Sequence, residues 1–193
     1  GLGEAIKALQ VLTLGAKEYY ALARMHSYVS SKKIEPVMKE FTGDIYQRPP
    51  QRTAVRRATR IRTVHSFDLL EQHERLVLMR IVCQAGTYVR KIIYDLGEVL
   101  SLGATMIELR RTRVSCLSEK NESFVRLHHI LDAFERYKES GDETKLRQLI
   151  KPIEYCMDGV DTVVVRDTAI DALCHGAQLA IPGILSISKA LKV

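Results

Sequence analysis

The segment Gly86-Thr87-Tyr88-Val89-Arg90 carries a phenol and a guanidinium two positions apart, directly after a glycine. It stands where a strand-like stretch gives way to a helix-like one. Side chains two apart share a face in extended backbone but diverge on a helix, so Tyr88 and Arg90 converge only on the strand side of that junction. There they would form a pocket able to orient a carboxylate and a proton-accepting oxygen. A buried tyrosine beside a surface arginine is the alternative interpretation, because a motif of this size is weak alone.

The positive charge of the chain is concentrated in two arginine groups. Lysine and arginine number 29 against 23 acidic residues, which gives a net charge of +6. No acidic residue lies between Asp44 and Asp68, and this stretch holds Arg48, Arg52, Arg56, Arg57, Arg60 and Arg62. The second group is Arg110, Arg111 and Arg113. A charge run is usually a solvated surface, but two clusters in an otherwise balanced chain favour phosphate contacts and hence an RNA partner.

The sequence gives little support for a metal site or for a membrane-spanning segment. The four cysteines are spread out without a C-x-x-C pair and are typical of reduced core residues. His128-His129 and Cys174-His175 lack the spaced partners of a tetrahedral zinc site, so we expect no metal and no cofactor. No apolar run approaches the ~20 residues that span a bilayer, so we expect no membrane association.

Strand and helix patterns alternate around these residues. Helical spacing of apolar residues predicts helices over residues 5–12, 31–41, 89–100, 127–137, 144–150 and 168–174, the last capped by Asp167. Alternating or β-branched stretches predict strands over residues 17–28, 61–70, 76–82 and 162–165, with another running from residue 105 into the second arginine group. The strands at 61–70 and 76–82 should form a hairpin. This order predicts an α+β fold.

The character of the sequence changes at Gly159, where a β-branched run follows a helical region. We therefore expect two domains, residues 1–158 and residues 159–193. The chain opens with Gly1-Leu2-Gly3 and stops just as a new apolar segment begins, so we expect it to be part of a longer protein.

Four motifs occur in the order found in one enzyme family. They are Gly15-Ala16-Lys17-Glu18-Tyr19, Gln47-Arg48-Pro49-Pro50 followed by Thr53-Ala54-Val55, Ala85-Gly86-Thr87-Tyr88-Val89-Arg90, and Glu108-Leu109-Arg110-Arg111-Thr112-Arg113. With these motifs the chain resembles the TruB family of pseudouridine synthases. It is most similar to the guide-RNA-dependent branch of archaea and eukaryotes, the dyskerin-like catalytic subunit of the box H/ACA ribonucleoprotein. The tail, from Val165-Arg166-Asp167 through Cys174-His175-Gly176 to Pro182-Gly183, resembles the start of the PUA domain of that branch.

The resemblance implies a fold for each expected domain. Residues 1–158 would form a pseudouridine synthase catalytic fold without its N-terminal part, with a mixed, largely antiparallel sheet and flanking helices. Residues 159–193 would begin a small β PUA domain that binds RNA. The implied reaction detaches uracil from its ribose, turns it and rejoins it through carbon, without a cofactor.

The resemblance also assigns roles to individual residues. Tyr19 would stack on the extruded target base, as an aromatic face can. Tyr88 would contact the base and help remove the proton from C5, and Arg90 would pair with the catalytic aspartate and keep it ionised. Leu109 would pack the pocket floor. Lys17, the arginines of both groups and His175 would contact RNA.

The family nucleophile is an aspartate in a Gly-Thr-Leu-Asp-Pro segment, and these 193 residues contain no such segment. Asp44 follows Gly43 in a turn and Asp95 lies in a predicted helix, so neither matches the motif. We therefore expect a fragment that cannot catalyse the reaction alone, because its remaining groups only assist a carboxylate.

Three functions remain open from the sequence. The leading one is the guide-dependent subunit, which would act on rRNA and tRNA with an H/ACA guide RNA and small protein subunits, in the cytoplasm if archaeal and in the nucleolus if eukaryotic. The second is a stand-alone tRNA pseudouridine synthase, against which the arginine-rich 55–62 segment and the PUA-like tail argue. The third is a non-catalytic RNA-binding or assembly module.

Overall fold

The computed structural model describes residues 1–49 and 58–188, apart from the side chains of Glu4 and Ala8. Backbone contacts divide the chain into two compact units, Gly1–Leu149 and Ile150–Val193, and each is described by itself. The predicted boundary between two domains at residue 158 stays a prediction.

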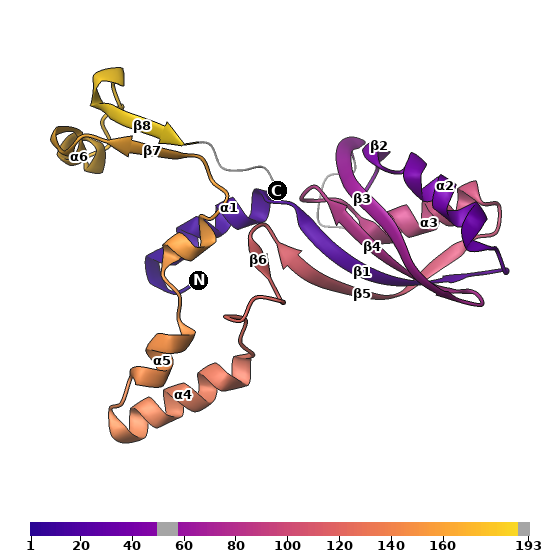
Figure 1. Cartoon of the computed structure of the whole chain (residues 1–193), viewed down its shortest axis with the longest axis horizontal. Helices are drawn as coiled ribbons and strands as arrows, with labels where there is room; N and C mark the ends of the chain where they lie inside the picture. Colours follow the sequence, from indigo (N-terminus) through magenta and orange to yellow (C-terminus); the bar gives the residue numbers. More distant parts are fainter. Residues whose placement is uncertain (50–57, 189–193) are drawn as a thin grey trace. The chain divides into compact units, whose positions relative to one another are not determined.

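The first unit is built around a six-stranded sheet with the order β2-β3-β4-β1-β5-β6 (Figure 1). Its strands are β1 (Lys17–Met25), β2 (Gly43–Gln47), β3 (Arg60–His73), β4 (Leu76–Cys83), β5 (Ala104–Val114) and β6 (Leu117–Ser118). Every strand pair within the described residues is antiparallel. The predicted α+β class, with a largely antiparallel sheet and flanking helices, is confirmed.

Strand β1 is central because β4 pairs with one of its edges and β5 with the other. Its side chains alternate between the two faces of the sheet, as the period of a strand requires. Ala21, Ala23 and Met25 are fully buried on one face. Glu18, which points to the other face, is also buried although it carries a charge.

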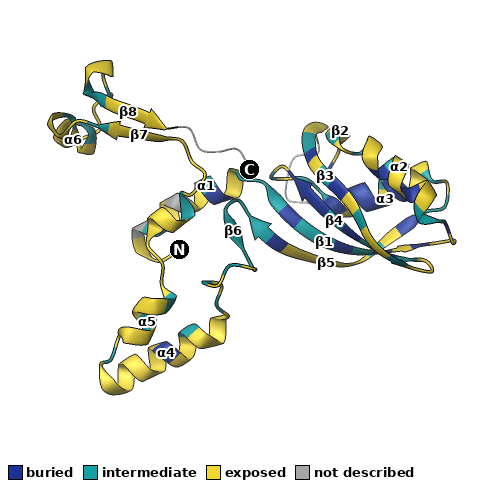
Figure 2. Cartoon of the chain, in the orientation of Figure 1, coloured by how far each residue is buried: buried dark blue, intermediate teal, exposed yellow. Residues whose placement is uncertain are grey.

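Two helices cover the apolar face of the sheet. They are α2 (Ser31–Glu40) and α3 (Val89–Val99), and their buried residues join those of the strands in one core (Figure 2). Helix α2 contributes Ile34 and Met38, while α3 contributes Ile92, Ile93 and Leu96. We call this side the helix-covered face, and it is where the hydrophobic stabilisation of the unit is concentrated.

Four further helical segments lie within the described residues of the first unit. They are the short 3-10 helix η1 (Gly3–Ala8), α1 (Leu9–Leu14), α4 (Leu127–Ser140) and α5 (Thr144–Leu149). Helix α4 ends at Gly141, whose N–H donates to the Tyr137 carbonyl and whose left-handed φ of 71° turns the chain out of the helix. Of the side chains in α4, only Ala133 is buried.

The second unit is small and pairs two strands. Its elements are η2 (Ile153–Cys156), β7 (Thr162–Val165), α6 (Asp167–Cys174), η3 (Ile181–Gly183) and β8 (Ile184–Ser188), with β7 antiparallel to β8. The predicted strand at residues 162–165 is confirmed. The predicted cap of α6 is off by one residue: Arg166 is the N-cap, and Asp167 lies in the first turn, where a carboxylate complements the helix dipole.

Two local predictions in the first unit were incomplete. The hairpin of β3 and β4 is confirmed, but its strands run further than predicted, and the turn consists of Glu74 and Arg75 alone. Strand β2 was missed, because its five residues pair only with residues 60–64 of β3 and carry too short a pattern to stand out.

Candidate functional site

Tyr88 and Arg90 lie at the start of α3 and not on a strand. Tyr88 is the N-cap residue with extended backbone, and Arg90 is the second helical residue. Tyr88 is half-buried and Arg90 is exposed. The strand geometry considered for the pair therefore does not occur, and any convergence of the two side chains must come from the first turn of the helix.

Tyr19, Leu109 and Arg111 share the helix-covered face of the sheet, on the paired strands β1 and β5. In the pairing of β1 with β5, Tyr19 lies opposite Arg111, and Ala21 lies opposite Leu109. Directly opposite residues of an antiparallel pair project on the same side. Tyr19 packs against the core, while Leu109 keeps 39% of its surface exposed. The sheet thus gathers an aromatic ring, an apolar side chain and a cation.

The start of α3 follows closely from one end of the sheet. Strand β4 ends at Cys83, which pairs with Lys17, two residues before Tyr19. The turn at Ala85-Gly86 then leads into α3. Gly86 has a φ of +79°, and a side chain there would come within 3.3 Å of the Arg62 guanidinium. The backbone conformation therefore favours glycine, and any larger residue would also displace the Arg62 guanidinium by a few tenths of an ångström.

The ionisable groups at this end of the sheet influence one another. Burial raises the pKa of the Tyr19 phenol, and the hydrogen bond and charge of Arg111 oppose that shift. Burial likewise raises the pKa of the Cys83 thiol, against a hydrogen bond from Thr87. Tyr19 is thus held as a neutral phenol.

Lys17 holds the end of α1. Its Nζ donates to the carbonyls of Thr13 at 2.7 Å and Gly15 at 2.8 Å, which lie at the C-terminus of that helix. Burial and the neighbouring Arg111 lower the pKa of the ammonium. An RNA contact by Lys17 stays a prediction, and the contacts seen here give the residue a structural task at the entry to β1.

The first arginine group is only partly within the described residues. Arg52, Arg56 and Arg57 lie outside them, as does the Thr53-Ala54-Val55 motif. Arg48 and Arg60 are exposed at the ends of β2 and β3. Arg62 is half-buried, with its guanidinium beside Gly86. The described members of the group thus line the β2–β3 edge next to the turn that precedes α3.

The second arginine group lies on β5. Arg110 forms an ion pair with Glu119 at 2.9 Å, and Arg113 donates to the Ser115 carbonyl at 3.2 Å. An open pocket of about 300 Å³ adjoins this strand, lined by Arg111, Thr112, Arg113, Val114, Leu117, Ser118, Glu119 and Phe124. Its arginines and the aromatic ring of Phe124 suit a nucleotide chemically, since bases stack on aromatic faces and phosphates accept from guanidinium.

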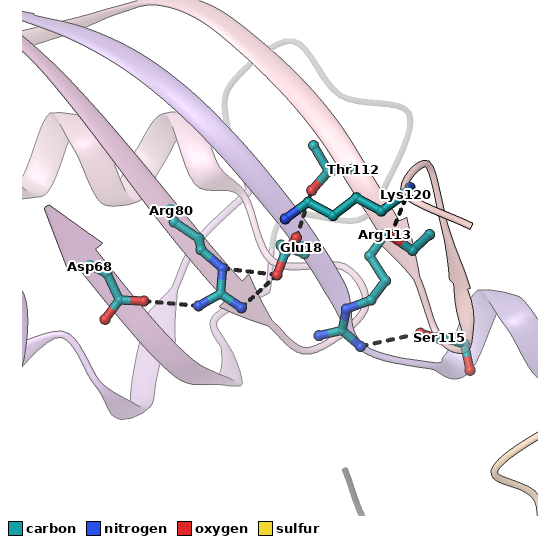
Figure 3. A network of polar contacts seen from close by, with 8 residues as sticks. Glu18, Asp68, Arg80, Thr112, Arg113, Ser115 and Lys120 are labelled. Carbon is teal, nitrogen blue, oxygen red and sulfur yellow. Dashed lines mark hydrogen bonds and ion pairs between the residues drawn. The ribbon is translucent and has the colours of Figure 1, made fainter. Parts of the chain in front are cut away.

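A partly buried ionic network on the opposite face of the sheet was not predicted from the sequence. Glu18 accepts from Nε and Nη2 of Arg80 at 2.9 and 2.6 Å and from the Thr112 hydroxyl at 2.8 Å (Figure 3). Arg80 also pairs with Asp68 at 3.3 Å. We call the side of the sheet that carries Glu18, Arg80 and Thr112 the polar face. Although burial alone would raise it, the pKa of the Glu18 carboxyl is lowered overall by hydrogen bonds from Thr112 and Arg80.

His175 belongs to the second unit and is exposed at the end of α6. Its Nδ1 lies 2.8 Å from the carbonyl oxygen of Asp171, one turn earlier in the helix. Within residues 1–49 and 58–188, no three His, Cys, Asp or Glu side chains come together as metal ligands would. None of the described helices has the length and apolar character needed to cross a membrane.

Comparison with known proteins places the chain in a family. A model described as "Pus10, C-terminal" matches residues 4–101, and one described as "tRNA pseudouridylate synthase B C-terminal domain" matches residues 90–158. A "Probable tRNA pseudouridine synthase B" of Methanopyrus kandleri is 46% identical over 191 residues, 99% of this chain and 56% of that protein. The chain belongs to the TruB family of pseudouridine synthases.

Further relatives match this chain to a similar extent. The protein of the same name from Methanocaldococcus jannaschii is 46% identical over 98% of this chain and 56% of its own length. A chain in the "Crystal Structure of a Cbf5-Nop10-Gar1 Complex" matches with a TM-score of 0.86 and 43% identity, over 92% of this chain and 54% of that chain. This TruB-family chain therefore spans little more than half the length of the relatives it matches.

A further solved structure contains RNA. A chain in the "Structure of H/ACA RNP bound to a substrate RNA containing 2'-deoxyuridine" matches with a TM-score of 0.84 and 38% identity, over 96% of this chain and 55% of that chain. The expected similarity to the H/ACA branch of the TruB family is confirmed.

Proposed function

We propose that the protein containing this chain converts uridine to pseudouridine in RNA as the guide-dependent catalytic subunit of a box H/ACA ribonucleoprotein. The observation that carries the proposal is the close structural likeness to chains of two H/ACA complexes, one of them bound to a substrate RNA. Its partners would be an H/ACA guide RNA, a target rRNA or tRNA, and small protein subunits.

The placement of the candidate residues supports this proposal. Tyr19 lies on the helix-covered face near the end of the sheet where Lys17 pairs with Cys83, and Leu109 lies on the same face, opposite Ala21 in the middle of β1. Tyr88 follows in the turn that leaves this end. A stacking ring, an apolar floor and a second phenol would thus border one cavity, which is what handling an extruded base requires.

Each group then has a proposed task. Tyr19 stacks on the target base, Leu109 supports it, and Tyr88 assists removal of the C5 proton. Arg90 pairs with the nucleophilic aspartate and favours its ionised form. Arg48, Arg60, Arg62, Arg110, Arg111 and Arg113 hold the RNA backbone, together with Lys17 and, in the second unit, His175.

No residue of this chain is proposed as the nucleophile. Asp44 accepts a hydrogen bond from the Thr63 hydroxyl at 2.7 Å, and Asp95 is paired with Lys91. The family aspartate stands in a Gly-Thr-Leu-Asp-Pro segment that the 193 residues do not contain. We further propose that residues 159–193 begin a PUA domain and that an archaeal protein of this type acts in the cytoplasm.

The test supplies the full-length protein with a target RNA whose uridines carry tritium at C5. We expect tritium release only when an H/ACA guide RNA complementary to the target and the small partner proteins are present. A guide with a scrambled recognition sequence is the matched control. Absence of release under every condition would contradict the proposal and favour a non-catalytic RNA-binding module.

A stand-alone tRNA enzyme is the second candidate, because relatives 46% identical to this chain are named "Probable tRNA pseudouridine synthase B". Efficient release of tritium from bare tRNA, with neither guide nor partner proteins, would favour it. The same assay therefore separates the two candidates.

Arg90 offers a test of the proposed ion pair within the same protein. We expect Arg90→Ala to abolish turnover while RNA affinity changes little, because the guanidinium acts on the aspartate and not on phosphate. Filter binding of the labelled target measures the affinity. Equal losses of turnover and affinity would make Arg90 a phosphate contact instead.

A further inference from the structure

Gln47 is buried at the end of β2, with 3% of its surface exposed. Glu18 and Thr112 are also buried and polar, and they bond to each other across strands. Gln47 instead bonds to the backbone of a residue 41 positions later, in a different element. A buried side-chain amide persists only where its donor and acceptor are matched, so this contact is specific.

The amide of Gln47 holds both backbone polar groups of Tyr88. The Tyr88 N–H donates to Oε1 at 2.9 Å, and Nε2 donates to the Tyr88 carbonyl at 3.2 Å. Tyr88 is the N-cap of α3, so its N–H has no acceptor within the helix, and no side-chain cap bond is made there. Its carbonyl already accepts from the Lys91 and Ile92 amides, which makes the Gln47 donor a third bond at that oxygen.

The other end of the same turn is anchored to the neighbouring strand. Gln84 donates its N–H to the Thr63 carbonyl at 2.8 Å, and its Oε1 accepts from the Thr63 N–H at 3.3 Å. Between these anchors, Gly86 lies against Arg62. The turn from Gln84 to Tyr88 is therefore fixed to the β2–β3 edge at both ends, although it emerges from β4.

We infer that Gln47 is a positioning residue that sets the orientation of Tyr88 for base isomerisation, and this inference rests on the proposed function. The two hydrogen bonds fix the backbone from which the phenol projects. A misplacement of about 1 Å at a reacting group can lower a rate about 100-fold. The β2–β3 edge also carries Arg60 and Arg62, and it thereby connects the first arginine group to the start of α3.

The experiment compares two glutamine substitutions in the full-length protein with its guide and partners. Gln47→Leu keeps the volume and removes both bonds, and we expect kcat to fall about 100-fold with KM within about twofold, because orientation is lost and RNA binding is kept. Gln72→Leu is the matched control, since Gln72 donates to the Val29 and Glu74 carbonyls around the β3–β4 hairpin. It should leave kcat unchanged.

A third variant separates positioning from folding. Gln47→Glu keeps the acceptor for the Tyr88 N–H and loses the donor to its carbonyl, so we expect an intermediate kcat. Amide hydrogen exchange at Tyr88 should be faster in Gln47→Leu than in the wild type and unchanged in Gln72→Leu. If Gln47→Leu does not fold, a reduced kcat in folded Gln47→Glu supports the inference and a wild-type kcat overturns it.

The remaining outcomes distinguish this inference from the proposed function. An active wild type with an equally active Gln47→Leu, or with a change in KM alone, overturns the positioning role and leaves the function standing. An inactive wild type under every condition overturns the function. In that case amide exchange at Tyr88 still tests the two hydrogen bonds of Gln47: faster exchange in Gln47→Leu would show that they hold the Tyr88 backbone, and unchanged exchange would show that they do not.

Discussion

The two faces of the six-stranded sheet are held by different forces. On the helix-covered face, side chains such as Met79 and Ile81 are excluded from water by α2 and α3. On the polar face, Glu18 is kept in place by Arg80 and Thr112. Neighbouring residues of β1 differ accordingly: burial raises the pKa of Tyr19, while hydrogen bonds lower that of Glu18.

This difference shows how one strand serves two purposes. The apolar side provides most of the stability, because the hydrophobic effect is the largest favourable contribution to folding. It does not depend on the direction of the contacts. The charged side adds specificity, because the ion pair of Glu18 with Arg80 and its hydrogen bond from the Thr112 hydroxyl form only in one register of the paired strands. The candidate residues Tyr19 and Leu109 lie at the margin of the apolar side, where a ring is packed but not enclosed.

The largest effect should come from a cavity on the helix-covered face. Ile92→Ala should lower the free energy of unfolding by about 3 kcal/mol, since Ile92 is fully buried between α3 and the sheet. Urea unfolding of this chain measures the loss. Val99→Ala on the exposed side of the same helix is the control and should change it by less than about 1 kcal/mol. Equal losses would mean that the face is not the main source of stability.

The next effect tests the polar face at neutral pH. Glu18→Gln keeps the shape of the side chain, and it should lower the free energy of unfolding by about 2 kcal/mol through the loss of charged hydrogen bonds. Asp68→Asn, which weakens the outer and more exposed pair of Arg80, should cost less than about 1 kcal/mol. A reversed order would show that Asp68 and not Glu18 is the main partner of Arg80.

The pH dependence of the same variant follows from the sign of the shift. The folded protein lowers the pKa of Glu18 below its model-compound value of 4.5, so its contribution is complete above that pH and is lost as the pH falls through the folded pKa. The Tm difference between wild type and Glu18→Gln should therefore shrink on acidification from pH 7 to about pH 3. A difference that stays constant with pH would contradict the cause given for the shift.

The smallest effect lies outside both faces, where the chain enters β1 and leaves β5. Ser115 has a left-handed φ of 52°, which a glycine adopts without strain, so Ser115→Gly should stabilise the chain by about 1 kcal/mol. A side chain at Gly15 would lie 2.5 Å from the Ser115 Cβ, so Gly15→Ala should destabilise it.

The double variant and its acid response complete that test. Combining Gly15→Ala with Ser115→Gly should cost less than the sum of the single changes, because the second removes the Cβ and Oγ atoms nearest to the new methyl group and leaves the Cα at 3.2 Å. Neither substitution should alter how Tm responds to acid, since Glu18 is untouched. If either substitution changed the dependence of Tm on pH, the polar face would extend to Gly15 and Ser115.

Local patterns in the sequence were sufficient for much of the fold. The alternation of β1 and the helical spacing of α3 each lie within about ten residues, so the strand, the helix and the α+β class could be predicted. Strand β2 could not, because its pattern is short and its partner lies beyond residue 57.

The contacts of the candidate site join residues that are far apart in the sequence. Tyr19, Tyr88 and Leu109 were proposed from motifs in a family order, whereas the bonds that surround them join distant residues. Glu18 meets Arg80 across 62 positions and Gln47 meets Tyr88 across 41. Such pairs leave no local signal, and the helical location of Arg90 was likewise decided by the position at which α3 begins.

The central position of β1 has a consequence for synthesis on the ribosome. Strand β1 is made before its neighbour β5, which contributes Thr112, 94 positions after Glu18. The β3–β4 hairpin can form from adjacent segments while translation continues, but β1 stays without its second edge until β5 has left the exit tunnel. The buried charge of Glu18 thus obtains its last partner only after β5 has been made, which makes this carboxylate a reporter of the pairing of β1 with β5.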